Sequence, residues 1–365
     1  MKPSIRLIAF YLPQFYPIPE NDLWWGKGFT EWRNVVKAKP LFKSHFQPHL
    51  PADLGFYDLR TLETRVEQIR LAKKHGIHGF CYYHYWFEGR RLLNRPVDDL
   101  LKTKELDFPF CLCWANENWT RSWDGENKSI LLHQNYSKTD DLNHIRWLSE
   151  IFTDNRYIRI NGKPIFLVYR AARIPEPYKT TEIWRKEALR LGVGEIFLCR
   201  VESFESEHSS PNALGFDGAV EFQPDWSNLG YKLKVSSFFE RIRSKLTGKN
   251  TIPAVYNYDD VVKRMMNKLQ PKYLRFPCVT PGWDNTARRG NNALVIHNST
   301  PRVYQDWLIW AIEKFKSSNK DNNIVFINAW NEWAEGCHLE PCIRWGDAFL
   351  KATVNALELS GQKQY

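Results

Sequence analysis

Two glutamates three residues apart are the pair in this sequence best suited to acid–base chemistry. Glu332 and Glu335 stand in the run Asn331-Glu332-Trp333-Ala334-Glu335, which follows a short apolar stretch. Hydrophobic walls raise the pKa of one carboxyl group so that it keeps its proton, while a neighbouring carboxylate stays ionised. Cleavage of a glycosidic bond needs that division of labour. The competing interpretation is a solvated first helical turn, where glutamate is common.

Tryptophans, amides and carboxylates gather after several other apolar runs. Aromatic rings stack on the C–H faces of sugars, and carboxylates and amides bond to their hydroxyls. For Glu117 the alternative is a structural salt bridge, and for His84 a hydrogen-bonded core position. The residues predicted to bind substrate are Tyr11, His84, Trp86, Asn116, Glu117, Trp119, Trp123, Asp124, Tyr169, Glu221, Trp226, Trp283, Asp284, Trp330, Asn331 and Trp333.

The elements that must position these residues alternate along the chain. Eight apolar, β-branched or aromatic runs predict strands at 5–12, 79–87, 108–114, 165–169, 196–201, 218–222, 276–280 and 324–330. Segments of helical period predict helices at 62–74, 96–103, 140–152, 182–191, 261–268, 301–316 and 347–359. This order favours an α/β fold of the (β/α)8 barrel type, in which the ends of all strands converge on one face. An open doubly wound sheet would need a glycine-rich phosphate turn, which the sequence lacks.

Composition and charge narrow the function classes. The chain has 365 residues, of which 43% are hydrophobic and 25% charged, so a large core is available and disorder is excluded. The net charge is +10, but residues 231–275 alone hold eleven Lys or Arg residues against three acidic ones. The rest of the chain is close to neutral, which argues against nucleic-acid binding. We expect a single catalytic barrel over 1–365 with a basic helical insertion at 228–275, between strands six and seven.

The basic insertion has two interpretations. It is either a solvated helical surface or a docking site for an anionic partner, such as a membrane surface, a lipid-linked glycan or an acidic polysaccharide. The chain start lacks the apolar stretch of an export signal, so we expect a cytoplasmic protein, with peripheral attachment to the inner membrane face as the alternative. Seven cysteines, most of them in apolar runs, are expected to be reduced and buried. The sequence contains no metal-site spacing typical of zinc proteins, and we expect no metal or cofactor.

Four motifs together resemble the WbsX-type proteins of the glycoside hydrolase family 99-like group. They lie at 9–15 (AFYLPQF), 28–32 (GFTEW), 114–119 (WANENW) and 330–341 (WNEWAEGCHLEP). The resemblance covers about residues 5 to 355 and implies a (β/α)8 barrel. It also implies a retaining, endo-acting glycosidase for α-linked, mannose-type bacterial polysaccharide, with no metal or cofactor.

The resemblance further implies a mechanism without an ordinary carboxylate nucleophile. Glu332 would take the proton of the sugar 2-hydroxyl and so close a 1,2-anhydro intermediate, and Glu335 would protonate the leaving oxygen. One alternative is a glycosyltransferase or transglycosylase of O-antigen or other surface-polysaccharide biosynthesis, with which WbsX-type proteins are associated. A non-catalytic glycan-binding barrel is another. The sequence lacks the D-x-D motif that is usual in nucleotide-sugar transferases, which favours hydrolysis or transglycosylation.

Overall fold

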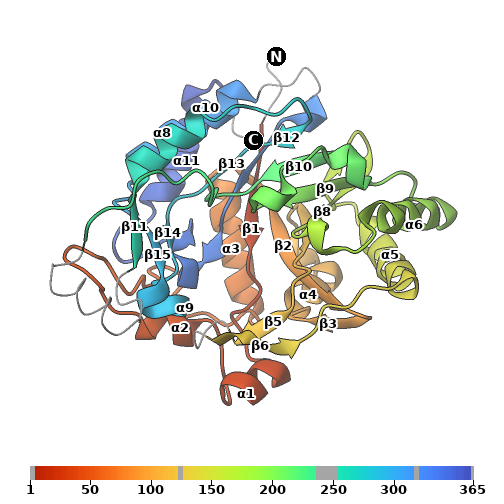
Figure 1. The fold of residues 1–365 in the computed structure, drawn as a ribbon, viewed down its shortest axis with the longest axis horizontal. Coiled ribbons are helices and arrows are strands. Elements are labelled where there is room, and N and C mark those ends of the chain that lie inside the picture. The colour runs from red at the N-terminus through yellow and green to blue at the C-terminus, as the bar shows by residue number, and fades with distance from the viewer. Residues whose placement is uncertain (1–4, 122–125, 236–252, 316–319, 363–365) are drawn as a thin grey trace.

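The main sheet is a nearly closed ring of parallel strands (Figure 1). The computed structural model describes residues 5–121, 126–235, 253–315 and 320–362. In the order of the ring, the strands are β1 (Arg6–Tyr11), β2 (Ile77–Phe87), β4 (Phe110–Trp114), β8 (Lys163–Val168), β9 (Phe197–Glu202), β10 (Gly218–Glu221), β12 (Arg275–Phe276), β13 (Cys278–Val279) and β16 (Ile324–Ile327). β16 pairs with β1, which brings the two ends of the chain together. The predicted (β/α)8 architecture is confirmed.

The seventh strand position of the barrel is split in two. β12 pairs with β10, and β13 pairs with β16. Pro277 lies between the two segments, and a proline has no N–H to contribute to a strand ladder. The two short strands therefore take the place of the one strand that was predicted at 276–280.

Helices cover the outside of this ring. They are α3 (Leu62–Lys74), α4 (Arg95–Lys102), α5 (Lys138–Phe152), α6 (Pro177–Arg190), α8 (Tyr258–Met266), α10 (Pro301–Lys314) and α11 (Ala348–Leu359). Two of them begin at side-chain caps that the sequence signals: Ser137 Oγ accepts from the Asp140 N–H, and Thr300 Oγ1 accepts from the Val303 N–H. All seven predicted helices are present, and their ends agree to within a few residues except at α6, which begins five residues before the predicted start.

Smaller elements decorate the barrel, and the sequence pattern did not predict them. A three-stranded sheet joins β11 (Ala254–Asn257), β15 (Leu294–His297) and β14 (Trp283–Asp284). Two-stranded pairs form between β5 (Trp119–Arg121) and β6 (Glu126–Leu132), and between β17 (Asn331–Glu332) and β18 (Cys337–His338). β3 (Arg90–Leu92) pairs with β2, and β7 (Arg159–Ile160) pairs with β8. The short helices are α1 (Pro19–Trp25), α2 (Trp32–Lys37) and α9 (Thr286–Arg289).

Strand β2 illustrates how the barrel is packed. Ten of its eleven residues are buried, because one face fills the barrel and the other lies under helices. All seven cysteines are buried, and none forms a disulfide. In the described ranges, no helix is long and apolar enough to cross a membrane.

Part of the predicted basic insertion is visible between β10 and β12. β11 joins the small sheet, and α8 packs against α10. Residues 236–252 lie outside the described residues. A separate insertion at 228–275 stays a prediction.

Candidate active site

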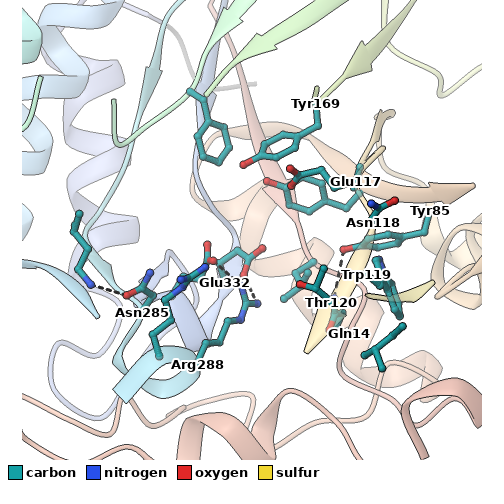
Figure 2. A pocket seen from close by; sticks show the side chains of 18 of the residues that line it. Gln14, Tyr85, Glu117, Asn118, Trp119, Thr120, Tyr169, Asn285, Arg288 and Glu332 are labelled. Atoms are coloured by element: carbon teal, nitrogen blue, oxygen red, sulfur yellow. Dashed lines mark hydrogen bonds and ion pairs between the residues drawn. The ribbon is translucent and has the colours of Figure 1, made fainter. Parts of the chain in front are cut away.

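A cavity of about 540 Å³ opens at the C-terminal ends of the barrel strands (Figure 2). This volume is in the range of small-ligand sites. Its aromatic lining consists of Trp24, Trp25, Tyr83, Tyr85, Trp119, Tyr169, Phe204, Phe222, Trp226 and Trp283. Its polar lining consists of Gln14, Glu117, Asn118, Thr120, Asn285, Arg288, Arg289, Asn292, Glu332 and Glu335.

Glu332 and Glu335 share one guanidinium in the wall of this cavity. Nη2 of Arg288 lies 3.0 Å from Glu332 Oε2, and Nη1 lies 2.6 Å from Glu335 Oε1. The Nε atom of Arg288 lies 3.0 Å from Oε1 of Glu31, a third, fully buried carboxylate. Arg288 comes from the short helix α9, whereas Glu332 precedes and Glu335 ends one 3-10 turn, Trp333–Glu335. One cation therefore fixes both carboxyl groups relative to each other.

The turn that carries Glu335 is closed by a glycine for a steric reason. Gly336 has a left-handed φ of +61°, and a Cβ atom there would lie 2.9 Å from Cβ of Asp284. Asp284 is itself held from behind, because His45 Nε2 and Gln47 Nε2 each lie 2.7 Å from its Oδ2 atom. Asp284 thus supports the turn instead of lining the cavity.

Burial raises the pKa of Glu332 to about 8, against the opposing charge of Arg288 and with the help of the negative charges of Glu335 and Glu31. Burial also raises the pKa of Glu335, and again Arg288 opposes the shift. Burial disfavours the charged form of Arg288, but the three carboxylates raise its pKa well above the usual value. At neutral pH, Arg288 is therefore charged and Glu332 holds a proton.

Five of the predicted substrate-binding residues line the cavity together with the glutamate pair. They are Glu117, Trp119, Tyr169, Trp226 and Trp283. Glu117 also forms the salt bridge that was its alternative role, with Arg170 Nη1 at 2.6 Å from its Oε1 atom. Trp226 and Trp283 meet at 4.9 Å between ring centroids and 75° between planes, and so form an aromatic corner.

Two predicted residues, Trp123 and Asp124, lie outside the described residues. Nine others do not line the cavity: Tyr11, His84, Trp86, Asn116, Glu221, Asp284, Trp330, Asn331 and Trp333. For His84 and Trp86 the reason is the alternation of side chains along β2. Their rings point to α5, where His84 Nε2 lies 3.0 Å from His144 Nε2 and Trp86 Nε1 donates to Asp140 Oδ1 at 2.9 Å.

Three of the predicted residues that do not line the cavity follow β16 and have structural partners. Asn331 bonds to both backbone groups of Leu12, at 2.7 Å from its N atom and 3.0 Å from its O atom. Trp330 packs on Phe80 with 5.0 Å between ring centroids. Trp333 is fully buried, and its partners are taken up below.

The remaining predicted residues that do not line the cavity serve similar ends. Tyr11 donates through its hydroxyl to Gln68 Oε1 at 2.8 Å. Asn116 bonds to the backbone of Arg170, donating to its carbonyl at 2.9 Å and accepting from its N–H at 2.8 Å. Glu221 accepts from Lys268 Nζ at 3.0 Å. Each of these side chains joins a strand end to a neighbouring segment.

The ion pair of Glu221 also bears on the basic segment. Lys268 Nζ lies 2.5 Å from Asp225 Oδ2, and Arg275 Nη1 lies 3.3 Å from Glu202 Oε2. These two cations of the segment 231–275 are therefore used inside the protein. They are not available to an anionic partner.

Sequence reasoning missed several lining residues. Tyr83 and Tyr85 lie on the same strand as the predicted residues His84 and Trp86 but point to its other face. Asn118 lies between two predicted residues, and Gln14 lies three positions after Tyr11. Arg288 has no local signal, because it lies in a short loop helix far from the glutamates in sequence. Within the part of the chain that the structure describes, no group of three or more His, Cys, Asp or Glu residues could hold a metal ion.

Comparison with known proteins places these observations in a family. The model of the family described as "Glycosyltransferase WbsX" matches residues 7–353. Two curated relatives from strains of Xanthomonas campestris pv. campestris, both called "Uncharacterized protein WxcX", are 44% identical over 352 residues. That match covers 96% of this chain but only 49% of each relative, so the chain spans about half their length.

Solved structures resemble this fold at low sequence identity. The endo-alpha-mannosidase of glycoside hydrolase family 99 from Bacteroides thetaiotaomicron matches with a TM-score of 0.55 and 17% identity, covering 98% of this chain and 97% of that one. A structure titled "Glycoside hydrolase-like protein" matches with a TM-score of 0.59 and 14% identity, covering 97% and 94%. At these identities the likeness concerns the fold.

Proposed function

This chain belongs to the WbsX family, and on that premise we propose that it is a retaining, endo-acting glycoside hydrolase. One observation carries the proposal: the buried carboxyl group of Glu332 and the half-buried carboxyl group of Glu335 meet one guanidinium inside a cavity with aromatic walls. Paired carboxyl groups and stacking surfaces are the requirements of glycoside cleavage. The proposed substrate is an α-linked, mannose-type bacterial polysaccharide. The fold shared with an endo-alpha-mannosidase supports that choice.

In the proposed reaction, the sugar 2-hydroxyl acts as the nucleophile. Glu332 takes its proton, and the oxygen displaces the glycosidic oxygen from C1 to close a 1,2-anhydro ring. Glu335 gives its proton to the leaving oxygen. Water then opens the ring with Glu335 as the base, and Glu332 returns the proton to O2. Two inversions at C1 retain the anomeric configuration.

The electrostatics of the pair suit these roles. A carboxylate with a raised pKa is a stronger base than an ordinary one, which helps it to remove a proton from a weakly acidic hydroxyl. Glu332 has a pKa of about 8 and is protonated at neutral pH. A sugar hydroxyl that donates a hydrogen bond to Glu332 favours its ionised form, and the proton that the reaction needs is then carried by Glu335. Arg288 stabilises whichever carboxylate is charged.

A second candidate is transfer of the glycosyl group to another sugar. The family description, a glycosyltransferase, favours it. Transfer and hydrolysis share the first half of the reaction and differ only in whether a sugar hydroxyl or water opens the intermediate. Incubation with an activated donor and a sugar acceptor, followed by mass spectrometry, would show a lengthened acceptor if transfer dominates.

The main test is product release from a panel of α-linked bacterial glycans. We expect new reducing ends whose anomeric configuration is retained by NMR. Glu335→Gln should lose about 10²–10⁴-fold in rate on natural linkages, but much less on substrates with a leaving group that needs no protonation. Glu332→Gln should lose activity on both kinds of substrate.

Glu182→Gln, on the exposed side of α6, is the matched control and should keep full activity. An equal loss for Glu335→Gln on both substrates would contradict its role as the acid. Release of products with inverted configuration would exclude the two-step mechanism.

Docking of an anionic lipid-linked glycan or membrane surface through residues 231–275 belongs to the same proposal. Each basic side chain near an anionic bilayer contributes about 1 kcal/mol, and Lys232 and Lys234 make no ion pair with the described residues. Vesicles with anionic lipids should bind the protein at low salt and release it at high salt. Equal binding to neutral vesicles would contradict the idea.

A further inference from the structure

Glu340 is a buried carboxylate that the proposed chemistry does not use. Only 2% of its surface is exposed. Its Oε2 atom accepts from Trp333 Nε1 at 2.7 Å and from the Tyr57 hydroxyl at 2.8 Å, and its Oε1 atom accepts from Gln68 Nε2 at 2.6 Å. Among the described residues no cation forms an ion pair with it. A charge that is buried without a counter-ion is costly, and three donated hydrogen bonds only offset that cost.

The three donors tie distant segments to one point. Trp333 lies in the 3-10 turn between the two glutamates of the site, Gln68 lies on α3, and Tyr57 precedes that helix. Asn331 adds a bond to the same cluster, because its Nδ2 atom lies 3.3 Å from the Tyr57 hydroxyl. The carboxylate of Glu340 accepts a hydrogen bond from each of the three donors.

Trp333 is the link between Glu340 and the site. Its ring stacks on His338 with 3.8 Å between centroids and packs on Trp32 at 5.6 Å. Its one polar atom, Nε1, is directed at Glu340. A displacement of Trp333 would move Glu332, which directly precedes it, and Glu335, two residues after it, relative to Arg288.

We infer that Glu340 is a positioning residue for the Glu332–Glu335 pair, acting through Trp333. The inference rests on the proposed function. The carboxylate is needed because only the ionised group accepts hydrogen bonds on both oxygens. A protonated or amide side chain carries an O–H or N–H group at one of these positions, and that group would face one of the three donors without an acceptor. An error of about 1 Å in the position of a reacting group can cost about 10²-fold in rate.

Among Glu340, Tyr57, Tyr11 and His338, Glu340 is the group whose pKa lies near neutrality. Burial raises its pKa to about 7, and the hydrogen bonds oppose the rise. Burial also raises the pKa values of Tyr57 and Tyr11 and lowers that of His338 to about 3, so these three are neutral at pH 7. As the pH falls through 7, Glu340 gains a proton and the hold on Trp333 weakens.

The test is the pH profile of Glu340→Gln. In the wild type, log kcat/KM should fall with a slope of one below about pH 8, where Glu332 gains a proton, and with a slope approaching two below about pH 7, where Glu340 gains one as well. In Glu340→Gln the slope should be one, kcat should be about 10–100-fold lower, and KM should change less than twofold. Tyr57→Phe, which removes one donor, should keep the slope of two and lose a few-fold in kcat. A slope of two with wild-type kcat in Glu340→Gln would overturn the inference.

Glu187→Gln is the matched control for a merely structural loss. Glu187 is a buried glutamate on α6, bonded to Arg146 and Arg190 and remote from the cavity, so its variant should lose stability and keep kcat. A second readout needs no turnover: NMR titration of carboxyl-labelled glutamate follows the apparent pKa values of the Glu332–Glu335 pair. Glu340→Gln should shift them by about half a unit or more, and Glu187→Gln should not. An unshifted pair refutes the positioning role, whereas an inactive wild type with a shifted pair refutes only the proposed hydrolysis.

Discussion

The two faces of strand β2 carry similar residues, but one face lines the cavity and the other packs against a helix. On one face, Tyr83 and Tyr85 reach the cavity. On the other face, His84 stacks on Trp147 at 4.7 Å and Trp86 stacks on His144 at 4.6 Å between ring centroids, and none of these rings reaches the cavity. Aromatic type does not distinguish the faces, but parity along the strand does. The helix-side rings should therefore govern stability, and the cavity-side hydroxyls should govern activity.

Trp86→Ala should give the largest effect on the helix side. Removal of a buried aromatic ring costs about 3–5 kcal/mol in free energy of unfolding. The change also leaves Asp140 without the indole donor that lies 2.9 Å from it. Urea denaturation should show the loss, while KM of the remaining folded enzyme stays near the wild-type value. A changed KM with unchanged stability would break the comparison.

Acid should lower the free energy of unfolding through the two histidines that meet at the helix side of β2. Burial lowers the pKa of His84 to about 3 and that of His144 well below its usual value. The unfolded chain binds protons on these histidines below about pH 6.5 and the folded chain does not, so their stabilising contribution is lost as the pH falls from about 6.5 towards 3. Each histidine should lower the free energy of unfolding by about 1.4 kcal/mol per pH unit in that window. In the variant His84→Phe, the pH dependence measured by denaturation should be shallower.

Tyr83→Phe should affect catalysis and leave the fold intact. Glu332 and Glu335 both help to raise the pKa of Tyr83, after burial and the nearby Tyr169, so its hydroxyl lies within electrostatic reach of the pair. Loss of one hydrogen bond to substrate is worth about 1.4 kcal/mol, or tenfold in kcat/KM. The melting temperature should not move. A shift in melting temperature with unchanged kinetics would assign Tyr83 to the structural group.

Tyr85→Phe should give the smallest effect. Its hydroxyl receives only a long bond, 3.4 Å, from Gln14 Nε2, and little is lost when it is removed. We expect a two- to threefold rise in KM with no change in kcat, because the amide of Gln14 still lines the cavity. Steady-state kinetics on the best glycan of the panel would measure it.

The sequence predicted the barrel better than the site. The strands could be predicted because apolar runs, separated by helical segments, mark their positions. That signal does not depend on which face of the sheet each side chain occupies. The site depends on that choice of face, and a strand buried on both sides has no polar alternation to reveal it. His84 and Trp86 were therefore predicted as binding residues, whereas Tyr83 and Tyr85 are the residues of this strand that line the cavity.

Arg288 shows a different limit. Its role depends on its ion pairs with Glu31, Glu332 and Glu335, and no sequence pattern near residue 288 predicts these pairs. Trp330, Asn331 and Trp333 lie within two residues of Glu332, yet they face the interior, because the chain enters a 3-10 turn there. Proximity in sequence to a reactive glutamate was a poor guide to proximity in space.

The bonds around strand eight also bear on the order in which the chain assembles. Asn331 bonds to Leu12 across 319 residues of sequence, and Glu340 bonds to Tyr57 across 283 and to Gln68 across 272. Contacts between such distant segments form late, because the long loop between them must first be closed. The site around Glu332 and Glu335 can exist only once the first and last strands of the barrel have met. Recovery of activity during refolding should therefore lag behind recovery of helical signal, and turnover would report on closure of the barrel.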